Sequence, residues 1–282
     1  MKTTWKKFPH ADPAYDYAAA ALRKNWPRLH RGDCEPYPDE ATLKGLAAGG
    51  SRLVPPMGMK EAATLLQEAW RAYHRGEFGK AVELGLSVGP LGHNVANKAA
   101  NIYATYLEQD SKRKEALFQE ASKRGEVLIG LMPASVNAWY FYAQALGRYS
   151  QCISVAKALA QGIGSKVKQA LERAIAVDPA HCDAHIALGA FHAEVIDKVG
   201  AMVGGLTFGA SKDEAVGNFE KALSLNPDSA IARIEYANGL VMMYGKSRMD
   251  KASMLYEEAA ACEPADAMER LDVELARSEL EA

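Results

Sequence analysis

The sequence lacks the features that usually assign a chain to a compartment. Four cysteines are scattered over 282 residues without forming a CxxC pair: Cys34, Cys152, Cys182 and Cys262. Such spacing favours reduced thiols, and hence a cytoplasmic protein, over a disulfide framework. The N-terminal stretch lacks the apolar core of a signal peptide, although an export signal removed from a longer chain stays an open alternative. No run of about twenty apolar residues occurs, so we expect no transmembrane helix.

An excess of charge and the signatures of common enzymes are also missing. The chain has 35 acidic and 33 basic residues, a formal net charge of -2. This balance gives no electrostatic reason for binding to nucleic acid or to an anionic membrane. Searches for GxSxG, HExxH, a GxGxxG turn and a phosphate-binding loop find nothing. The sequence therefore predicts a protein that is not an enzyme and that needs no cofactor.

What the sequence does contain is a regular helical pattern that prolines interrupt. Pro90, Pro133, Pro179, Pro227 and Pro264 are separated by 43, 46, 48 and 37 residues. Each interval holds two stretches with apolar residues at helical spacing, which predicts about five helical hairpins in an all-α chain. Residues 265–282 have the pattern of an amphipathic helix that closes the last hairpin. We divide the chain into an N-terminal helical cap with a linker, residues 1–58, and a repeat domain, residues 59–282.

Small and large residues alternate in a way that explains how the hairpins pack. Small side chains at helix contacts let helix axes approach closely, and large ones fill the gaps between pairs. One hairpin cannot bury its own apolar face, so we expect the hairpins to stack into an α-solenoid, a right-handed superhelix. The small contact residues are Ala143, Ala174, Gly189, Ala222, Ala237 and Ala259, and the large ones are Trp139, Tyr142, Phe219, Tyr236 and Tyr256.

In the cap, Asp12 and Pro13 are typical of a helix start, and we predict a short helix that Pro27 ends. Asp39 is the expected N-cap of a second short helix. The residues between these helices, RGDCEPYPDE, are predicted to form a loop.

Four segments carry a resemblance to known families: LERAIAVDP, HIALG, KVGAMVGGLTFGASKDEA and NFEKALSLNP. Through them residues 162–264 resemble the regulator of microtubule dynamics family, and residues 60–282 more broadly resemble the tetratricopeptide repeat (TPR) superfamily. The chain is also similar to the periplasmic TPR component of TRAP transporters, a class of substrate-binding transporters. These resemblances imply a helical scaffold that binds partner proteins and, in some members, an apolar ligand. They bring no catalytic residues with them.

A row of asparagines suggests where a partner would bind. In repeats of this type the first helix of each hairpin lines the concave face, and an asparagine side chain can both donate to and accept from a peptide backbone. We predict a groove for a protein or peptide partner, while a merely solvated polar face is the alternative. The groove residues are Asn94, Asn97, Asn101, Asn137, Tyr140, Gln144 and Arg148.

A second candidate site is the apolar, glycine-containing segment 198–211. Its side chains either pack over the next hairpin or form one wall of a pocket for a lipid, a fatty acid or a similar apolar molecule, with the following helix opposite. The candidate pocket residues are Val199, Met202, Val203, Leu206, Phe208, Ile231, Ile234, Val241 and Met242.

The group His181, Cys182, His185 and His192 has the residue types of a metal site, and the spacing of its histidines could bring three imidazoles together on one helix face. Because two of the three fall at core-facing repeat positions, we interpret them as packing residues and predict no metal site. Helical scaffolds with apolar edges can also self-associate, so a homo-oligomer is an open alternative.

Overall fold

The computed structural model describes residues 5–281, and the regular secondary structure in that range is entirely helical. The chain divides into two compact units. Unit 1 consists of Met1–His30, Glu35–Ala170 and Asp266–Met268, and unit 2 of Arg31–Cys34, Leu171–Ala265 and Glu269–Ala282. No helix among the described residues is long and apolar enough to cross a membrane.

Unit 1 holds the N-terminal helices and the first hairpins. Its elements are η1 (Pro13–Tyr15), α1 (Ala19–Leu29), α2 (Glu40–Ala47), η2 (Ser51–Leu53), α3 (Met59–His74), α4 (Phe78–Ser87), η3 (Pro90–Gly92), α5 (His93–Tyr106), α6 (Ser111–Leu131), α7 (Val136–Gln151), α8 (Val155–Ala160) and the first half of α9 (Ile163–Val177).

Unit 2 holds the later hairpins and the closing helix. Its elements are the second half of α9, α10 (Cys182–Val199), α11 (Ala201–Phe208), α12 (Lys212–Leu225), α13 (Ala230–Tyr244), η4 (Gly245–Arg248), α14 (Met249–Ala260) and most of α15 (Ala267–Glu281).

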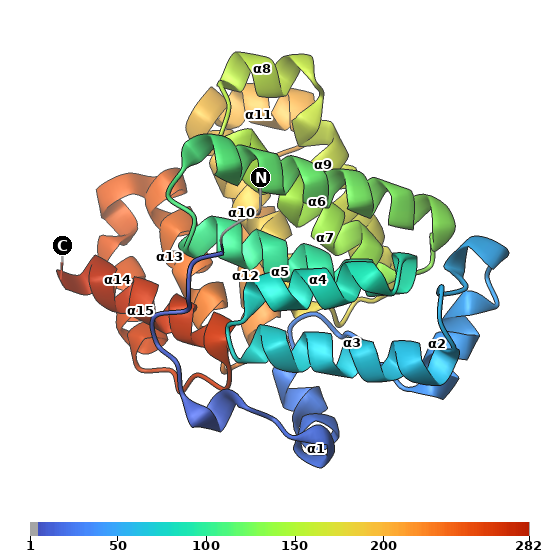
Figure 1. Cartoon of the computed structure of the whole chain (residues 1–282). Coiled ribbons are helices and arrows are strands. Elements are labelled where there is room, and N and C mark those ends of the chain that lie inside the picture. The colour runs from blue at the N-terminus through green and yellow to red at the C-terminus, as the bar shows by residue number, and fades with distance from the viewer. Residues whose placement is uncertain (1–4, 282) are drawn as a thin grey trace. The chain divides into compact units, whose positions relative to one another are not determined.

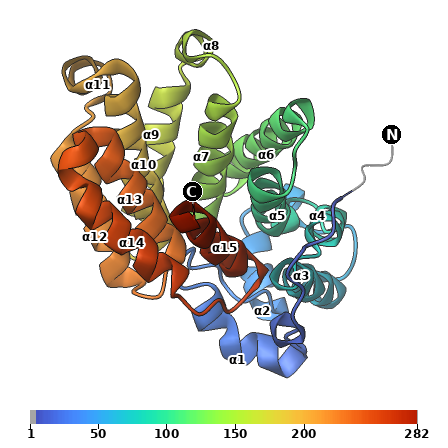
Figure 2. The ribbon, with the colours of Figure 1, turned by 90° about the vertical axis from the view of Figure 1, so that its left-hand side faces the viewer.

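Within each unit, helices pack with their neighbours in chain order. In unit 1, α3 packs on α4 and α5 on α6, while α3 also contacts α5 and α5 contacts α7 (Figures 1 and 2). In unit 2, α10 packs on α12 and α13 on α14, and α10 contacts α13. First helices therefore lie against first helices of the next hairpin. The proline punctuation is confirmed, because Pro133 and Pro227 lie between successive hairpins and Pro264 lies between α14 and α15.

Seven of the described α-helices begin at a side-chain cap. The cap residue lies in extended backbone, and its side chain accepts a hydrogen bond from the backbone N–H three residues further on, which satisfies a donor that the helix leaves unpaired. Asp39, predicted as such a cap, accepts from Thr42 N at 2.9 Å. The other caps of this kind are Asp110, Ser135, Ser154, His181, Ser211 and Ser229.

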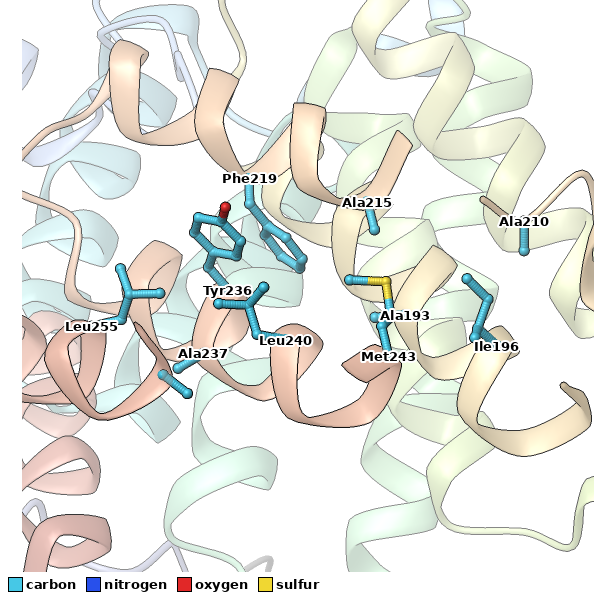
Figure 3. Close-up of a cluster of buried hydrophobic side chains, with 11 residues drawn as sticks. Ala193, Ile196, Ala210, Ala215, Phe219, Tyr236, Ala237, Leu240, Met243 and Leu255 are labelled. Carbon is cyan, nitrogen blue, oxygen red and sulfur yellow. The ribbon is translucent and has the colours of Figure 1, made fainter. Parts of the chain in front are cut away.

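Phe219 is the centre of the core of unit 2 (Figure 3). Its ring stacks on Tyr236 with centroids 5.1 Å apart, and a Cβ added to either Gly189 or Gly239 would come within 3.0 Å of the ring. The two glycines belong to α10 and α13, so the missing side chains make room for one aromatic ring between three helices. The predicted pairing of small and large contact residues is confirmed at this position.

Closing helix α15 covers the last hairpin, as its pattern predicted. Val273 and Ala276 are buried in a cluster with Ala230, Ile234 and Ala259 of α13 and α14. Leu280, at the end of the apolar stripe, is exposed. The buried residues of α15 therefore extend from its first turn, at Ala267, to Ala276, and only its last turn is exposed.

The N-terminal cap packs through aromatic rings. Trp26 stacks on His30 with centroids 3.9 Å apart, and both rings meet Trp70 of α3 edge to face. The predicted helix start at Asp12 and Pro13 is confirmed by η1, whose N-cap is Asp12. The prediction that one helix runs from there and ends at Pro27 is wrong, because η1 ends at Tyr15 and α1 begins at Ala19 and runs through Pro27 to Leu29. A proline near a helix end removes only one backbone hydrogen bond, and burial of Trp26 and Leu29 offsets that loss.

Candidate peptide-binding site

The polar face of unit 1 lies on α5 and α7, the first helices of neighbouring hairpins. Asn94, Asn97 and Asn101 follow one another at spacings of three and four residues, and Lys98 lies four residues after Asn94 and three before Asn101, so they share one face of α5. On α7 the corresponding residues begin with Asn137. The predicted asparagines are thus brought together by the packing of α5 against α7.

Asn94 and Asn137 hold the same carboxylate, that of Glu35. Asn94 Nδ2 donates to Glu35 Oε2 at 3.0 Å and Asn137 Nδ2 donates to the same oxygen at 2.6 Å. Both asparagines lie in the first turn of their helices. Glu35 belongs to a stretch without helical structure, residues 34–39, so one acidic side chain of a loop bridges two hairpins.

Further along α5, two asparagines use only half of their amide group. Asn97 Oδ1 accepts from Arg124 Nε of α6 at 2.8 Å, and Asn101 Nδ2 donates to Gln144 Oε1 of α7 at 2.9 Å. Both side chains are buried. Asn97 Nδ2 and Asn101 Oδ1 have no hydrogen-bond partner among residues 5–281. Buried amide atoms are nearly always hydrogen-bonded, so these two are capable of binding a further polar group.

On α7 the polar face continues away from Asn137. Gln144 Nε2 donates to the hydroxyl of Tyr140 at 3.3 Å, which extends the chain of hydrogen bonds that starts at Asn101. Arg148 Nη1 donates to Gln151 Oε1 at 3.3 Å, one turn further. Tyr140 is buried, whereas Gln144 and Arg148 are half-buried.

Burial governs the electrostatics of this face. Burial lowers the pKa of Arg124, although Glu120 opposes the shift. It also lowers the pKa of His93, the first residue of α5, to about 4, with a further contribution from the nearby Arg124 charge. Lys98 is buried, and its Nζ lies 5.8 Å from the centroid of Trp70 and 5.2 Å from that of Tyr73. Two cations are therefore enclosed beside neutral amides, an arrangement suited to an anionic or strongly polar ligand.

The predicted role of the seven residues in binding a partner stays a prediction. What the structure adds is their accessibility: Asn97, Asn101 and Asn137 are each at most 1% exposed, and Asn94, Gln144 and Arg148 are partly accessible. A peptide can therefore contact the amides of Asn97, Asn101 and Asn137 only if the side chains that bury them move aside.

Comparison with known proteins identifies the family. The family described as "Regulator of microtubule dynamics protein 1-3" matches residues 65–280, well over half of the chain. The chain belongs to this family. The match begins in α3 and ends in α15, so it includes α5 and α7 and leaves out the segment that carries Glu35.

One solved structure supports the fold. A thermophilic TPR protein from Thermus thermophilus is 17% identical and covers 77% of this chain and 99% of its own, with a TM-score of 0.54. The MamA protein is 16% identical, covering 78% of this chain and 96% of its own, with a TM-score of 0.40. No curated protein sequence matches the chain. Together with the family match, the first similarity shows that this member of the regulator of microtubule dynamics family is a TPR-like α-solenoid, as predicted.

The residues predicted to line an apolar pocket are distributed over unit 2. Gly200, with φ of 83°, separates α10 from α11, and Met202 and Leu206 of α11 are 79% and 85% exposed. Ile234 is buried under α15. Ile231 and Met242 are eleven residues apart on α13, which corresponds to about 16 Å along a helix. The structure thus gives these residues different surroundings, and their role in ligand binding stays a prediction. Half-buried or partly exposed members of the set are Val199, Val203, Phe208 and Val241.

The three histidines of α10 and its N-cap are buried and hydrogen-bonded within the fold. His181 Nδ1 accepts from Ala184 N at 3.0 Å, and His185 Nδ1 lies 2.8 Å from Asn218 Oδ1. His192 Nδ1 accepts from Ser211 N at 3.3 Å. Each imidazole contributes to packing or capping.

Sequence reasoning missed Glu35, which bonds to two of the asparagines, and Gln67, which holds the same loop. Gln67 Nε2 of α3 donates to Pro38 O at 3.0 Å. A signal was present, since an acidic residue followed by Pro36 and Pro38 predicts an extended segment with few backbone donors. That signal does not tell where the segment docks.

Proposed function

We propose that this chain is a non-enzymatic interaction scaffold, and that the α5–α7 face of unit 1 binds an extended peptide of a partner protein. The observation that supports the proposal is the continuous row of side-chain amides across two neighbouring hairpins, with Asn97 Nδ2 and Asn101 Oδ1 unused within residues 5–281. Side-chain amides spaced along a groove are suited to the alternating donors and acceptors of a peptide backbone.

Capture of partners by the tagged full chain tests this proposal. Asn97→Ala and Asn101→Ala are each expected to reduce the captured partner at least fivefold, because each removes one amide from the row. Asn238→Ala is the matched control, since Asn238 accepts from the Tyr256 hydroxyl in unit 2 and belongs to no part of the row. The family description names regulation of microtubule dynamics, so purified tubulin is the first defined probe. Unchanged capture by both variants, with folding verified by circular dichroism, would reject the proposed face.

A second candidate function is the binding of an apolar ligand through α11. Supporting it are the exposure of Met202, Val203 and Leu206 and the absence of any charged residue between Lys198 and Lys212. Native mass spectrometry before and after delipidation is expected to show a bound lipid or fatty acid, which Leu206→Ser should remove. Identical spectra in both states would reject this function.

A further inference from the structure

Residues 35–38, Glu-Pro-Tyr-Pro, are held on unit 1 in the manner of a bound peptide. The segment has no regular secondary structure. Side chains of surrounding helices contact its backbone: Trp26 Nε1 donates to Glu35 O at 2.6 Å, and Gln67 Nε2 donates to Pro38 O at 3.0 Å. Pro36 and Pro38 have no N–H to offer, so carbonyls carry the backbone contacts.

The side chains of the segment are recognised as well. Two amides, from Asn94 and Asn137, converge on the Glu35 carboxylate. The Tyr37 ring meets Trp26 edge to face at 5.0 Å, and the Arg23 guanidinium lies over the ring at 4.7 Å. A short extended chain with an acidic side chain and an aromatic one is therefore bound through both backbone and side chains, which are the two elements of peptide recognition in a groove.

From this arrangement we infer that residues 35–38 occupy the partner site in cis, and that the partner in trans presents an acidic side chain to Asn94 and Asn137. The inference rests on the proposed function and specifies its ligand class. A carboxylate fits these donors because hydrogen bonds to an ionised acceptor are stronger than those to a neutral one. The enclosed Lys98, on the same face of α5, adds positive charge close to the asparagines.

Because residues 35–38 occupy the site in cis, they compete with any peptide that binds in trans. A tethered segment competes at an effective concentration on the order of millimolar. A free peptide of similar chemistry therefore binds weakly to the intact chain and more tightly once the tethered carboxylate is removed. A natural partner has to exceed the tethered segment in affinity, and the unused amide atoms of Asn97 and Asn101 are the groups through which a longer peptide can gain that affinity.

The test uses the chain's own sequence as a defined probe: a fluorescein-labelled peptide of residues 33–40 with Cys34→Ser, followed by fluorescence anisotropy. Against the full-length protein, Glu35→Ala is expected to bind the peptide at least tenfold more tightly than the wild type does. The same peptide with Glu35→Gln is expected to bind the Glu35→Ala protein at least tenfold more weakly. Adding Asn137→Ala to Glu35→Ala should abolish the gain, whereas adding the control Asn238→Ala should preserve it.

A second readout follows the segment itself. Because the Trp26 indole donates to Glu35 O, its ¹⁵N–¹H signal, assigned with Trp26→Phe, is expected to shift in Glu35→Ala and in the wild type at millimolar peptide. If Glu35→Ala fails to fold, Glu35→Gln keeps the shape and one acceptor and is expected to give a smaller gain in the same assays.

Equal binding by the wild type and Glu35→Ala, no binding by either, or indifference to the Glu→Gln change in the peptide would each overturn the inference. These outcomes are distinct from failure of the proposed function, which is read from partner capture by Asn97→Ala and Asn101→Ala. If partner capture still depends on Asn97 and Asn101 while the peptide assay is negative, the scaffold function is retained. Only the inference that residues 35–38 occupy the site in cis is then rejected.

Discussion

Helices α5 and α13 are both first helices of a hairpin, yet their buried faces differ in chemistry. α5 buries amides and a cation, and each amide that is used pairs with a side chain from another element. α13 buries mainly apolar side chains, among them Ile234, Tyr236 and Leu240, and makes room for Phe219 with a glycine. Both helices also bury alanines, such as Ala96 and Ala100 on α5 and Ala232 and Ala237 on α13.

The comparison distinguishes the residues that stabilise the stacked helices from the buried amides, which stacking does not require. Small contact residues set the distance between helices in both places, so they are sufficient for the hairpins to stack. A buried amide stabilises little beyond the desolvation it has to offset, so a row of them is not needed for stacking. The stability of the fold therefore does not account for the polar row of unit 1, and this is why we propose a role in binding for it.

The largest expected effect on stability comes from a substitution in the apolar core beside α13. Phe219→Ala is expected to reduce the free energy of unfolding by about 3–5 kcal/mol, because it removes a fully buried ring and leaves a cavity between α10, α12 and α13. Urea unfolding followed by circular dichroism measures it. Met202→Ala, on the exposed face of α11, serves as control and should change stability by less than about 0.5 kcal/mol. A loss for Phe219→Ala no larger than that of the control would contradict the assignment of the core.

The next effect concerns the start of the polar helix. Burial holds the pKa of His93 at about 4 in the folded chain, against about 6.5 when unfolded. Below pH 6.5 the unfolded state binds a proton that the folded state does not, so stability falls as the pH drops from 6.5 towards 4. The expected loss from pH 7 to pH 4 is about 2–3 kcal/mol. At the corresponding first position of α13 stands Ala230, which cannot titrate.

Urea unfolding at a series of pH values measures this loss, with His93→Gln as the comparison. The variant should lose most of the acid sensitivity that His93 contributes and keep the remainder from other groups. Superimposable pH profiles for the wild type and His93→Gln would show that burial of His93 is not what makes unit 1 sensitive to acid.

The smallest expected effect is the difference in coupling energy between one side-chain hydrogen bond of α5 and one of α13. A double-mutant cycle with Asn101→Ala and Gln144→Ala is expected to give a coupling energy of about 1 kcal/mol, because Gln144→Ala leaves the fully buried Asn101 Nδ2 without its acceptor and Asn101→Ala leaves Gln144 Oε1 without its donor. The matched cycle in unit 2 uses Asn238→Ala and Tyr256→Phe and should give less, because both residues are half-buried whereas Asn101 is fully buried. Equal coupling in the two cycles would mean that burial on α5 adds nothing to the strength of its amide pairs.

Much of the fold followed from local pattern, and much of the site did not. Proline spacing and the alternation of small and large residues predicted the hairpins, and the residue type of Asp39 predicted that it caps α2. These predictions hold because each signal acts within one turn or one hairpin. Pro27 was misread, since the packing of Trp26 and Leu29 outweighs the local preference. The asparagines were found by their helical spacing, whereas their partner Glu35 lies 59 residues from Asn94 and 102 from Asn137.

The sequence by itself determined that this chain would form stacked helical hairpins, because the apolar face of each hairpin has to be covered by a neighbour and the contact residues are small enough to allow it. Only the tertiary structure decided which polar groups meet on that framework. Whether Glu35 reaches Asn94 and Asn137 depends on the path of a loop with no regular hydrogen bonds of its own, and such a path is fixed by the surfaces it docks on rather than by any local preference.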